Sequence, residues 1–312
     1  MKAFSYIKLI IHPFETIANI VNANGNRIES LLRQEHFDRA VSSLTNLALH
    51  SNELGITNEH ISDNEIVVSL TSYGKRIHEV YLAIESIMQG TIKPNKIILW
   101  LSEEEFKNKE LPTILKKQQE RGLEIKYCKD IKSYKKIINT LKEYPNASII
   151  TIDDDLIYNF ELVENLVQSH KSKPNCIWAN RIHEITYNEN GSLKSYLQWK
   201  WNSRTGAKNS KHNFFTSGGG TLFPPHSLND EVLNEDVFME LCPTADDVWL
   251  NAMARLQKTE ICKSFTHDSK GDDFLVNENL QADGLSTINN APQNNQNDLQ
   301  IKAVFNRYGI TI

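Results

Sequence analysis

The chain has 312 residues, of which 40% are hydrophobic and 23% are charged. This is the composition of a folded protein with enough length for one large domain and an appendage. Its formal net charge is -5, so it lacks the basic field that holds a nucleic-acid backbone or an anionic membrane. We therefore expect no nucleic-acid partner.

Residues 1–62 are predicted to form an N-terminal helical region, because apolar residues recur there at three- and four-residue steps. These residues are Ile28, Leu31, Leu32, Phe37, Ala40, Val41, Leu44, Leu47 and Ala48. The preceding run YIKLIIHPF is too short and too often interrupted to span a bilayer, and no cleavage site follows it. Dimerisation, docking to a membrane-bound assembly and peripheral membrane contact stay open for this region.

The cysteines are Cys128, Cys176, Cys242 and Cys262, which are far apart in sequence and form no C-x-x-C pair. This spacing predicts neither a zinc site nor a disulfide framework. It favours a reducing compartment. We expect a cytoplasmic protein, located at the inner face of the cell membrane if the N-terminal end makes peripheral contact.

Strands and helices alternate from residue 63 to residue 160. Apolar, β-branched runs predict strands at 66–70, 96–101, 123–128 and 148–152, and amphipathic runs predict helices at 78–89, 112–120 and 134–144. This alternation predicts βαβ units and a mainly parallel sheet covered by helices. Residues 63–160 would be a nucleotide-binding half, because ligands of open α/β sheets bind beyond the carboxyl ends of the strands.

Residues 161–312 are predicted to complete the same domain as an acceptor half. Strand-like pieces occur at CIWANRI and SYLQWKW, followed by the glycine run SGGG and the helical pattern DDVWLNAMARL. The segment from Asn277 to Gln300 is rich in Asn and Gln, which predicts a long, irregular and mobile loop.

Three consecutive aspartates, Asp153, Asp154 and Asp155, follow the strand at 148–152. If the extended conformation continues, Asp153 and Asp155 point to one side and Asp154 to the other. Two such carboxylates repel and raise each other's pKa unless a cation or strong donors offset their charge. A divalent cation such as Mg²⁺ or Mn²⁺ explains the triplet better than a helix cap, for which one Asp would suffice.

Five segments occur in the order typical of a glycosyltransferase with the GT-A fold: IVVSLTSYGKR, KDIKSYKK, ITIDDD, SGGGTLFPP and ADDVWL. Across about residues 63–270 the chain resembles bacterial sugar transferases of the family 2 type. The resemblance implies an α/β fold of GT-A type, here with an N-terminal helical extension. It also implies transfer of a sugar from a nucleoside diphosphate, by expectation UDP, with Mn²⁺ or Mg²⁺ on the diphosphate.

The resemblance also assigns roles to residues of the nucleotide-binding half. Thr71 and Tyr73 would contact the nucleoside, Asp130 its base, Asp153 the ribose or the metal, and Asp155 the metal. Further donor contacts are expected from Arg76, Lys135, Asp154 and Gly219. For the lysines near strand ends, Lys75, Lys132 and Lys135, a solvated surface position is the competing interpretation.

The pair Asp246 and Asp247 opens the helix predicted from DDVWLNAMARL, where acidic residues also serve as caps. In inverting members of the resembled family, an acidic dyad at this place deprotonates the acceptor hydroxyl. The match makes Asp247 the candidate base and Asp246 its supporting neighbour. This chain has Asp246 where Glu is usual.

Two further features carry weaker expectations. If QWKW is a strand, Trp199 and Trp201 lie on the same side of it, either as a stacking surface for an acceptor sugar or as core residues. His267 resembles a C-terminal histidine that completes the metal shell in some transferases of this fold, although a lone histidine is more often a surface or core residue.

The expected function is metal-dependent, inverting glycosyl transfer to a glycan or lipid-linked acceptor in bacterial surface polysaccharide or lipooligosaccharide synthesis. One alternative is a phosphatase of the haloacid dehalogenase type, which Asp153-x-Asp155 partly fits. Ile157 stands where that family has Thr or Val, and four strand-like runs precede the motif. The second alternative is a non-catalytic nucleotide-binding module that recruits partners through its N-terminal helices.

Overall fold

The computed structural model describes residues 13–208, 210–264, 274–281, 284, 289–290 and 295–311. The chain forms two compact units, Met1–Thr45 and Asn46–Ile312. The helical prediction for the N-terminal region is confirmed over Pro13–His50, which is one continuous helix, α2. Ile28, Leu31 and Leu32 are exposed on it. No helix among the described residues is both long enough and apolar enough to cross a membrane.

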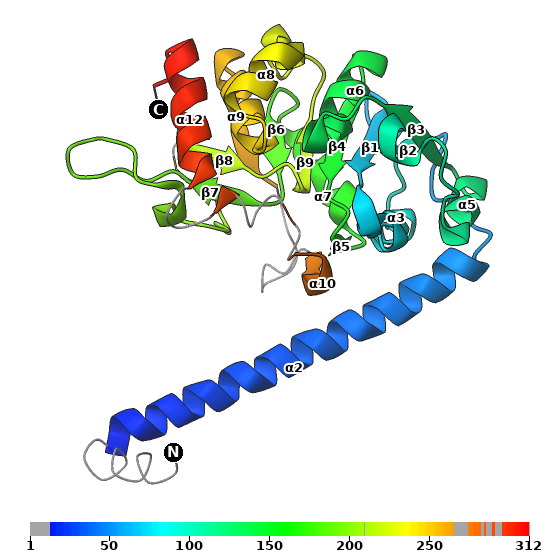
Figure 1. Ribbon diagram of the computed structural model, residues 1–312, viewed down its shortest axis with the longest axis horizontal. Helices are drawn as coiled ribbons and strands as arrows, with labels where there is room; N and C mark the ends of the chain where they lie inside the picture. Colours follow the sequence, from blue (N-terminus) through cyan, green and yellow to red (C-terminus); the bar gives the residue numbers. More distant parts are fainter. Residues whose placement is uncertain are drawn as a thin grey trace. The chain divides into compact units, whose positions relative to one another are not determined.

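The second unit is built on a seven-stranded sheet in the order β10-β6-β9-β4-β1-β2-β3 (Figure 1). Its strands are β1 (Ile66–Thr71), β2 (Lys96–Ser102), β3 (Leu123–Cys128), β4 (Ser148–Ile152), β6 (Ile177–Ala179), β9 (Gly219–Phe223) and β10 (Ile261–Lys263). All pairings are parallel except those of β9, which runs antiparallel to both β4 and β6. The order β3-β2-β1-β4 is that of a doubly wound nucleotide-binding half. The predicted α/β class, with a mainly parallel, Rossmann-like sheet covered by helices on both faces, is confirmed.

The central strands are apolar on both faces because helices cover both faces. On one side, Ile150 and Ile152 of β4 pack with α3 (Tyr81–Met88), α5 (Thr113–Glu120) and α7 (Leu162–Ser172). On the other, Ile149 packs with α6 (Lys135–Glu143), α8 (Glu235–Leu241), α9 (Asp246–Leu256) and α12 (Gln296–Tyr308). Figure 1 shows α6, α9 and α12 on one side of the sheet and α3 and α7 on the other.

Shorter elements complete the unit. Two small antiparallel sheets pair β5 (Leu156–Tyr158) with β11 (Phe274–Val276) and β7 (Ile182–Glu184) with β8 (Asn213–Phe215). A four-residue helix, α4 (Glu103–Phe106), follows β2, and another, α10 (Glu278–Gln281), follows β11. Short 3₁₀ turns lie at Gly74–His78, Lys132–Tyr134, Tyr196–Gln198, Ser210–His212 and Asp230–Leu233.

Two predictions for the second half are wrong. SYLQWKW is not a strand, because Tyr196–Gln198 is a 3₁₀ turn and only Lys200 makes an isolated bridge, to Glu184. The segment 277–300 is not one irregular loop, because it contains α10 and the start of α12. The side chain of Asn295 caps α12 by accepting a hydrogen bond from the Asp298 amide, and Ile301, Val304 and Phe305 bury its inner face.

Candidate active site

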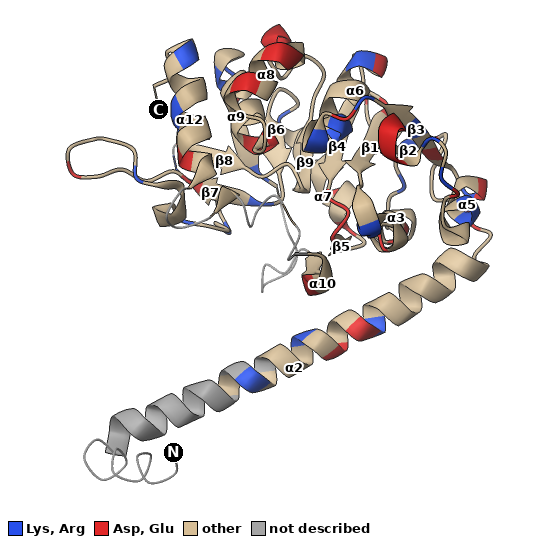
Figure 2. Cartoon of the chain, viewed as in Figure 1, with Lys and Arg blue, Asp and Glu red and all other residues tan. Residues whose placement is uncertain are grey.

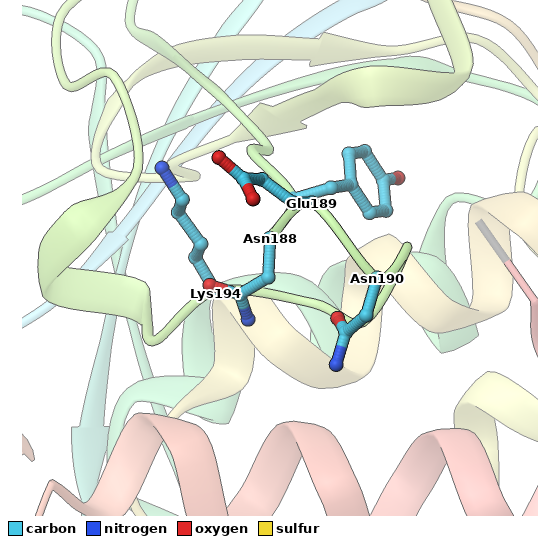
Figure 3. A pocket seen from close by; sticks show the side chains of 5 residues that line it. Asn188, Glu189, Asn190 and Lys194 are labelled. Atoms are coloured by element: carbon cyan, nitrogen blue, oxygen red, sulfur yellow. The ribbon is translucent and has the colours of Figure 1, made fainter.

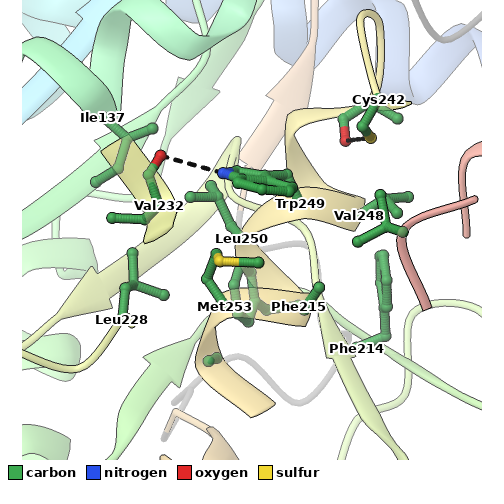
Figure 4. Packing of buried hydrophobic residues seen from close by; sticks show 14 of the residues in the cluster. Ile137, Phe214, Phe215, Leu228, Val232, Cys242, Val248, Trp249, Leu250 and Met253 are labelled. Carbon is green, nitrogen blue, oxygen red and sulfur yellow. Dashed lines mark hydrogen bonds between the residues drawn. The ribbon is translucent and has the colours of Figure 1, made fainter. Parts of the chain in front are cut away.

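Two acidic clusters face each other at one edge of the main sheet. Asp153, Asp154 and Asp155 follow the carboxyl end of β4, and Asp246 and Asp247 form the first turn of α9. Helix α9 is held in place by its buried face, where Val248, Trp249, Leu250 and Met253 lie in the core (Figure 4). The indole Nε1 of Trp249 also donates to the Val232 carbonyl at 3.1 Å. The two clusters therefore come from rigid elements.

Lys136 joins the two clusters. This lysine is 3% exposed, and its Nζ lies 2.6 Å from Asp153 Oδ1 and 3.4 Å from Asp246 Oδ2. Burial alone would lower the pKa of Lys136, but the charges of Asp153, Asp246 and Asp247 raise it above its ordinary value. Burial likewise acts to raise the pKa of Asp153, and the Lys136 charge and hydrogen bond lower it overall. Asp153 is thus kept ionised by a cation that it shares with Asp246.

The other two carboxylates of the triplet share Arg76. One guanidinium nitrogen lies 2.7 Å from Asp154 Oδ1 and 3.1 Å from Asp155 Oδ2, and the other donates to the Leu280 carbonyl at 2.6 Å. Asp154 also accepts a hydrogen bond from Ser72 Oγ at 2.6 Å. Burial, partly offset by Arg76, raises the pKa of Asp154 to about 6. Burial and then the Asp153 charge raise the pKa of Asp155.

The dyad is held by donors from two loops. The Ser217 amide donates to Asp247 Oδ1 at 2.7 Å, and Ser133 Oγ donates to Asp246 Oδ1 at 2.9 Å. Burial, and next the charge of Asp246, raise the pKa of Asp247 to about 6. A carboxylate with this pKa is mostly ionised at neutral pH and is a stronger base than an exposed aspartate.

The glycine run closes the site beside Asp153. A Cβ added at Gly218 would stand 1.5 Å from Asp153 Oδ2, and one at Gly219 would stand 2.5 Å from the Cβ of Arg181. Tyr158 reinforces this corner, since its hydroxyl accepts from the Asp153 amide and donates to the Gly218 carbonyl. Only glycine allows so close an approach of β9 to the end of β4.

Arg181 is a partly buried cation near the triplet. It follows β6, its guanidinium stacks over the ring of Phe274 at 5.2 Å, and it donates to Thr216 Oγ1. Its charge helps to lower the pKa of Asp153 and opposes the rise in the pKa of Asp155. Within the described part of the chain, five aspartates (Asp153, Asp154, Asp155, Asp246, Asp247) thus face three cationic side chains (Lys136, Arg76, Arg181), an excess of two negative charges.

This donor set fits a hard divalent cation. Carboxylate oxygens are the ligands that Mg²⁺ and Mn²⁺ prefer, and an excess of two negative charges matches one such ion. Asp154 is the most enclosed of the three, with its side chain 6% exposed and bound to Ser72 and Arg76. The side chains of Asp153 and Asp155 are 35% and 14% exposed, so these two are best placed to hold the ion. His267, the third metal ligand that the resemblance suggests, lies outside the described residues.

Lys135 and the predicted nucleoside contacts lie at the carboxyl ends of β1 and β3. Lys135 Nζ lies 2.5 Å from Asp130 Oδ1, after β3. Thr71 Oγ1 donates to the Trp100 carbonyl at 2.8 Å, and Tyr73 is exposed with the Arg76 guanidinium 5.0 Å above its ring. A hollow of about 300 Å³ opens beside Gly74 and Lys75. These roles stay predictions.

Lys136 and Arg181 are site residues that the sequence reasoning missed. Lys136 lies in a lysine-rich stretch whose members are usually solvated, and it gives no signal of its own. Arg181 lies just beyond the carboxyl end of a strand, which is where ligands of open sheets bind. That position was the available signal.

No protein-family model and no curated protein matches the chain. Among solved structures, it is similar to S. aureus TarS 1-349 in complex with UDP, at 11% identity and a TM-score of 0.44, over 65% of this chain and 58% of that one. A second structure of TarS 1-349 gives a TM-score of 0.46 at 11% identity, over 78% and 71% of the two chains. CMP:2-keto-3-deoxy-manno-octonic acid synthetase with CTP gives 0.37 at 11% identity, over 65% and 89%. The chain spans less than two thirds of the UDP-bound TarS chain, and at these scores the site is interpreted from its own residues.

Two other features lie apart from the acidic clusters. An open hollow of about 530 Å³ is lined by one loop, with Tyr187, Asn188, Glu189, Asn190 and Lys194 around it (Figure 3). Among the described residues, Cys176, Glu260 and Cys262 place three potential metal-ligand atoms within 4.8 Å of one another. Glu260 pairs with Lys173, and burial raises the pKa of the Cys262 thiol to about 12. The Cys262 thiol is therefore protonated at neutral pH, beside a glutamate that is already ion-paired.

Charges of both signs are interspersed over the α/β unit (Figure 2). At the site, the buried cations Arg76 and Lys136 are already paired with neighbouring aspartates, Asp154 and Asp153.

Proposed function

We propose that the protein is a metal-dependent glycosyltransferase that moves a sugar from a nucleoside diphosphate donor, UDP by preference, to a hydroxyl group of a glycan or lipid-linked acceptor. One observation supports this most directly: Lys136 ties the strand-end triplet to the dyad of α9, so a cation site and a candidate base lie within one side chain's reach. Bacterial surface-glycan synthesis on the cytoplasmic side of the membrane is the setting proposed.

Asp153 and Asp155 would hold Mn²⁺ or Mg²⁺, which when bound supplies Lewis-acid stabilisation of the departing diphosphate. Arg181 adds positive charge at the same place. Asp247 accepts the proton of the acceptor hydroxyl, the oxygen of that hydroxyl forms the new bond to the anomeric carbon, and the bond from that carbon to the diphosphate oxygen breaks. Attack from the face opposite the leaving group inverts the anomeric configuration.

The rest of the machinery positions these groups. Arg76 and Ser72 hold Asp154 inward and so fix the backbone of the triplet. Ser217 presents its amide to Asp247, which orients that carboxylate without removing its charge. Lys136 prevents mutual repulsion of the two clusters while no cation is bound.

The test is diphosphate release from a panel of nucleotide sugars, with Mn²⁺, with Mg²⁺ and with excess chelator. We expect turnover that needs the metal, and a loss of at least a hundredfold in Asp155→Asn. Asp236→Asn is the matched control, because Asp236 is an exposed acid in the first turn of α8. Full activity in excess chelator would contradict the proposal.

Two outcomes would favour the alternatives. Phosphate release from a phosphomonoester such as p-nitrophenyl phosphate, without nucleotide-sugar turnover, would favour the phosphatase. Metal-dependent binding of UDP in a thermal-shift assay, with no turnover of any sugar nucleotide, would favour a binding module.

A further inference from the structure

The chain has five tryptophans, all within the described part, and one of them differs from the rest. Trp100, Trp178, Trp199 and Trp249 are at most 8% exposed, whereas Trp201 is 39% exposed. Trp199 is therefore a core residue. The indole of Trp201 is a large apolar surface left in contact with water, which makes it a candidate for ligand contact.

Trp201 is held rigidly on one side. Its ring stacks on the imidazole of His183, with centroids 4.8 Å apart and planes 13° from parallel, and it meets the ring of Tyr196 edge-on at 5.3 Å. The indole Nε1 donates to the Tyr196 carbonyl at 3.0 Å. Since one face and the polar edge are already occupied, the exposed area belongs mainly to the opposite face.

The stack is uncharged. His183 is 3% exposed, its Nδ1 accepts a hydrogen bond from the Asn202 amide at 3.1 Å, and burial lowers the pKa of its imidazole to about 3. Charged and polar residues lie next to the two stacked rings in the chain: Lys200 precedes Trp201 and its Nζ is 2.7 Å from Oε1 of Glu184, which follows His183, and Ser203 Oγ also bonds Glu184. A neutral aromatic face with hydrogen-bonding residues beside it in the chain suits a pyranose ring, which has apolar C–H faces and hydroxyl groups at its edge.

The exposed face of Trp201, here called the platform, is linked to the candidate base, Asp247, through backbone hydrogen bonds. The Ser203 amide, two residues after Trp201, donates to the Ile182 carbonyl at 2.8 Å. Arg181 comes directly before Ile182, and its carbonyl accepts a hydrogen bond from the Thr216 amide at 3.2 Å. Next along the chain is Ser217, whose amide bonds Asp247.

Tyr196 contacts the same indole. Its ring meets Trp201 edge-on, and burial, followed by the charge of Asp247, raises the pKa of its hydroxyl. The backbone hydrogen bonds above therefore connect Trp201 to Ser217, the residue that holds Asp247.

We infer that the exposed face of Trp201 binds a sugar ring of the acceptor, and so holds the glycan with a hydroxyl directed to Asp247. This inference rests on the proposed function and adds the substrate class of the acceptor side. A nucleobase could also stack on an indole, so the experiment below distinguishes a sugar from UDP.

Binding is measured first, because it does not depend on turnover. The emission of the exposed Trp201 is quenched by acrylamide, whereas the four buried indoles are shielded. The probes are methyl pyranosides of glucose, galactose and N-acetylglucosamine, with UDP plus Mn²⁺ as a separate arm. We expect at least one pyranoside to protect the quenchable emission in the wild type. Because both variants lack this reporter, binding of that pyranoside to them is measured by calorimetry, and we expect heat of binding with the wild type and Trp201→Phe but none with Trp201→Ala.

Kinetics then locate the effect. With the best donor of the nucleotide-sugar panel and the protecting pyranoside as acceptor, Trp201→Ala should raise the acceptor KM at least tenfold with little change in the donor KM. Trp201→Phe keeps a flat ring and should restore the acceptor KM to within about threefold of the wild type. Phe160→Ala removes an aromatic of similar exposure, 46%, and should change neither KM.

The inference is overturned if UDP, and no pyranoside, protects Trp201, or if an enzyme that transfers sugar keeps its acceptor KM in Trp201→Ala. Loss of the fold in Trp201→Ala is covered by Trp201→Phe, which must bind the pyranoside if the ring is a platform. If no nucleotide sugar turns over while a pyranoside still protects Trp201, the proposed function fails and the sugar site stands.

Discussion

Replacing Lys136 by Met tests whether one buried cation holds the two acidic clusters together. Methionine has nearly the same length and volume and no charge, so the core around α6 stays filled. At 2.6 Å from Asp153 and an effective dielectric constant near 20, the gross attraction is roughly 6 kcal/mol. Much of it offsets desolvation. Removing the buried cation leaves Asp246, whose side chain is 11% exposed, and the partly exposed Asp153 without their shared partner, which costs about 3–5 kcal/mol of the free energy of unfolding.

We expect the melting temperature to fall by roughly 6–20 °C, since about 1 kcal/mol corresponds to 2–4 °C in a unit of this size. The assay is thermal or urea unfolding followed by tryptophan emission, because all five tryptophans lie in the α/β unit. The matched control is Lys135→Met. Lys135 is the preceding residue and equally buried, but its partner Asp130 is 46% exposed, so the loss should be about 1 kcal/mol or less.

The pH dependence gives an independent check. Lys136 depresses the pKa of Asp153 in the folded protein, so this stabilisation is present above the unfolded pKa of about 3.9 and is lost as the pH falls through the folded value. The difference in stability between wild type and Lys136→Met should therefore shrink below about pH 4.

A double variant, Lys136→Met with Asp153→Asn, removes both charges and should recover about half or more of the loss at neutral pH. If Lys136→Met stays within about 1 kcal/mol of the wild type and the double variant is no more stable than the single one, the reasoning is refuted.

Three further predictions concern the proposed chemistry and its support. Asp247→Asn should lower kcat about 10²–10⁴-fold, with little change in UDP affinity measured by calorimetry. The wild-type kcat/KM should fall about tenfold per pH unit below about pH 6, where Asp247 becomes protonated. A kcat/KM that does not fall at acidic pH, or an active Asn variant, would rule out Asp247 as the base. Gly218→Ala should weaken Mn²⁺-dependent UDP binding at least tenfold, because the new Cβ would occupy the place of Asp153 Oδ2. Gly25→Ala in α2, which has open space around it, should leave that binding unchanged. Equal affinities of the two variants would contradict a role for Asp153. In Arg76→Lys, the lysine cannot contact Asp154, Asp155 and the Leu280 carbonyl together. Amide hydrogen exchange at Leu275 and Val276 of β11 should therefore quicken, while exchange in β1 changes less. A uniform change across the α/β unit would mean that Arg76 does not hold the segment from β11 to Leu280 in place.

The sequence was sufficient for features that repeat locally. Four strands and the helices between them follow from periodicity, since β1, β2 and β4 are apolar runs buried on both faces and α5 and α6 each bury one face. The helix at Asp246–Leu256 was predicted from its acidic first turn and its apolar spacing. The aspartate triplet stood out because three adjacent like charges at a strand end are costly without a partner.

Long-range features could not be derived in this way. β9 is five residues long, begins with two glycines and runs antiparallel between β4 and β6, and nothing local specifies those neighbours. α12 was missed because its cap and first turn, Asn295 to Asp298, are Asn, Gln and Asp, a composition shared with loops. Lys136 and Arg181 were missed because their positive charges are stabilised in the fold by carboxylates that are distant in sequence. Only the completed sheet brings those carboxylates close to them.

The insertion of β9 has a consequence for how the protein could be cut or assembled. Residues 46–160 hold the strands β1–β4, yet in isolation β4 would present its whole outer edge to solvent, an apolar edge that readily pairs with a second chain. Gly218, which shapes the corner around Asp153, arrives with that same missing strand. A fragment ending near residue 160 should therefore self-associate. The proposed cation site at Asp153 and Asp155 should become organised only after synthesis has passed residue 223 and β9 has paired with β4.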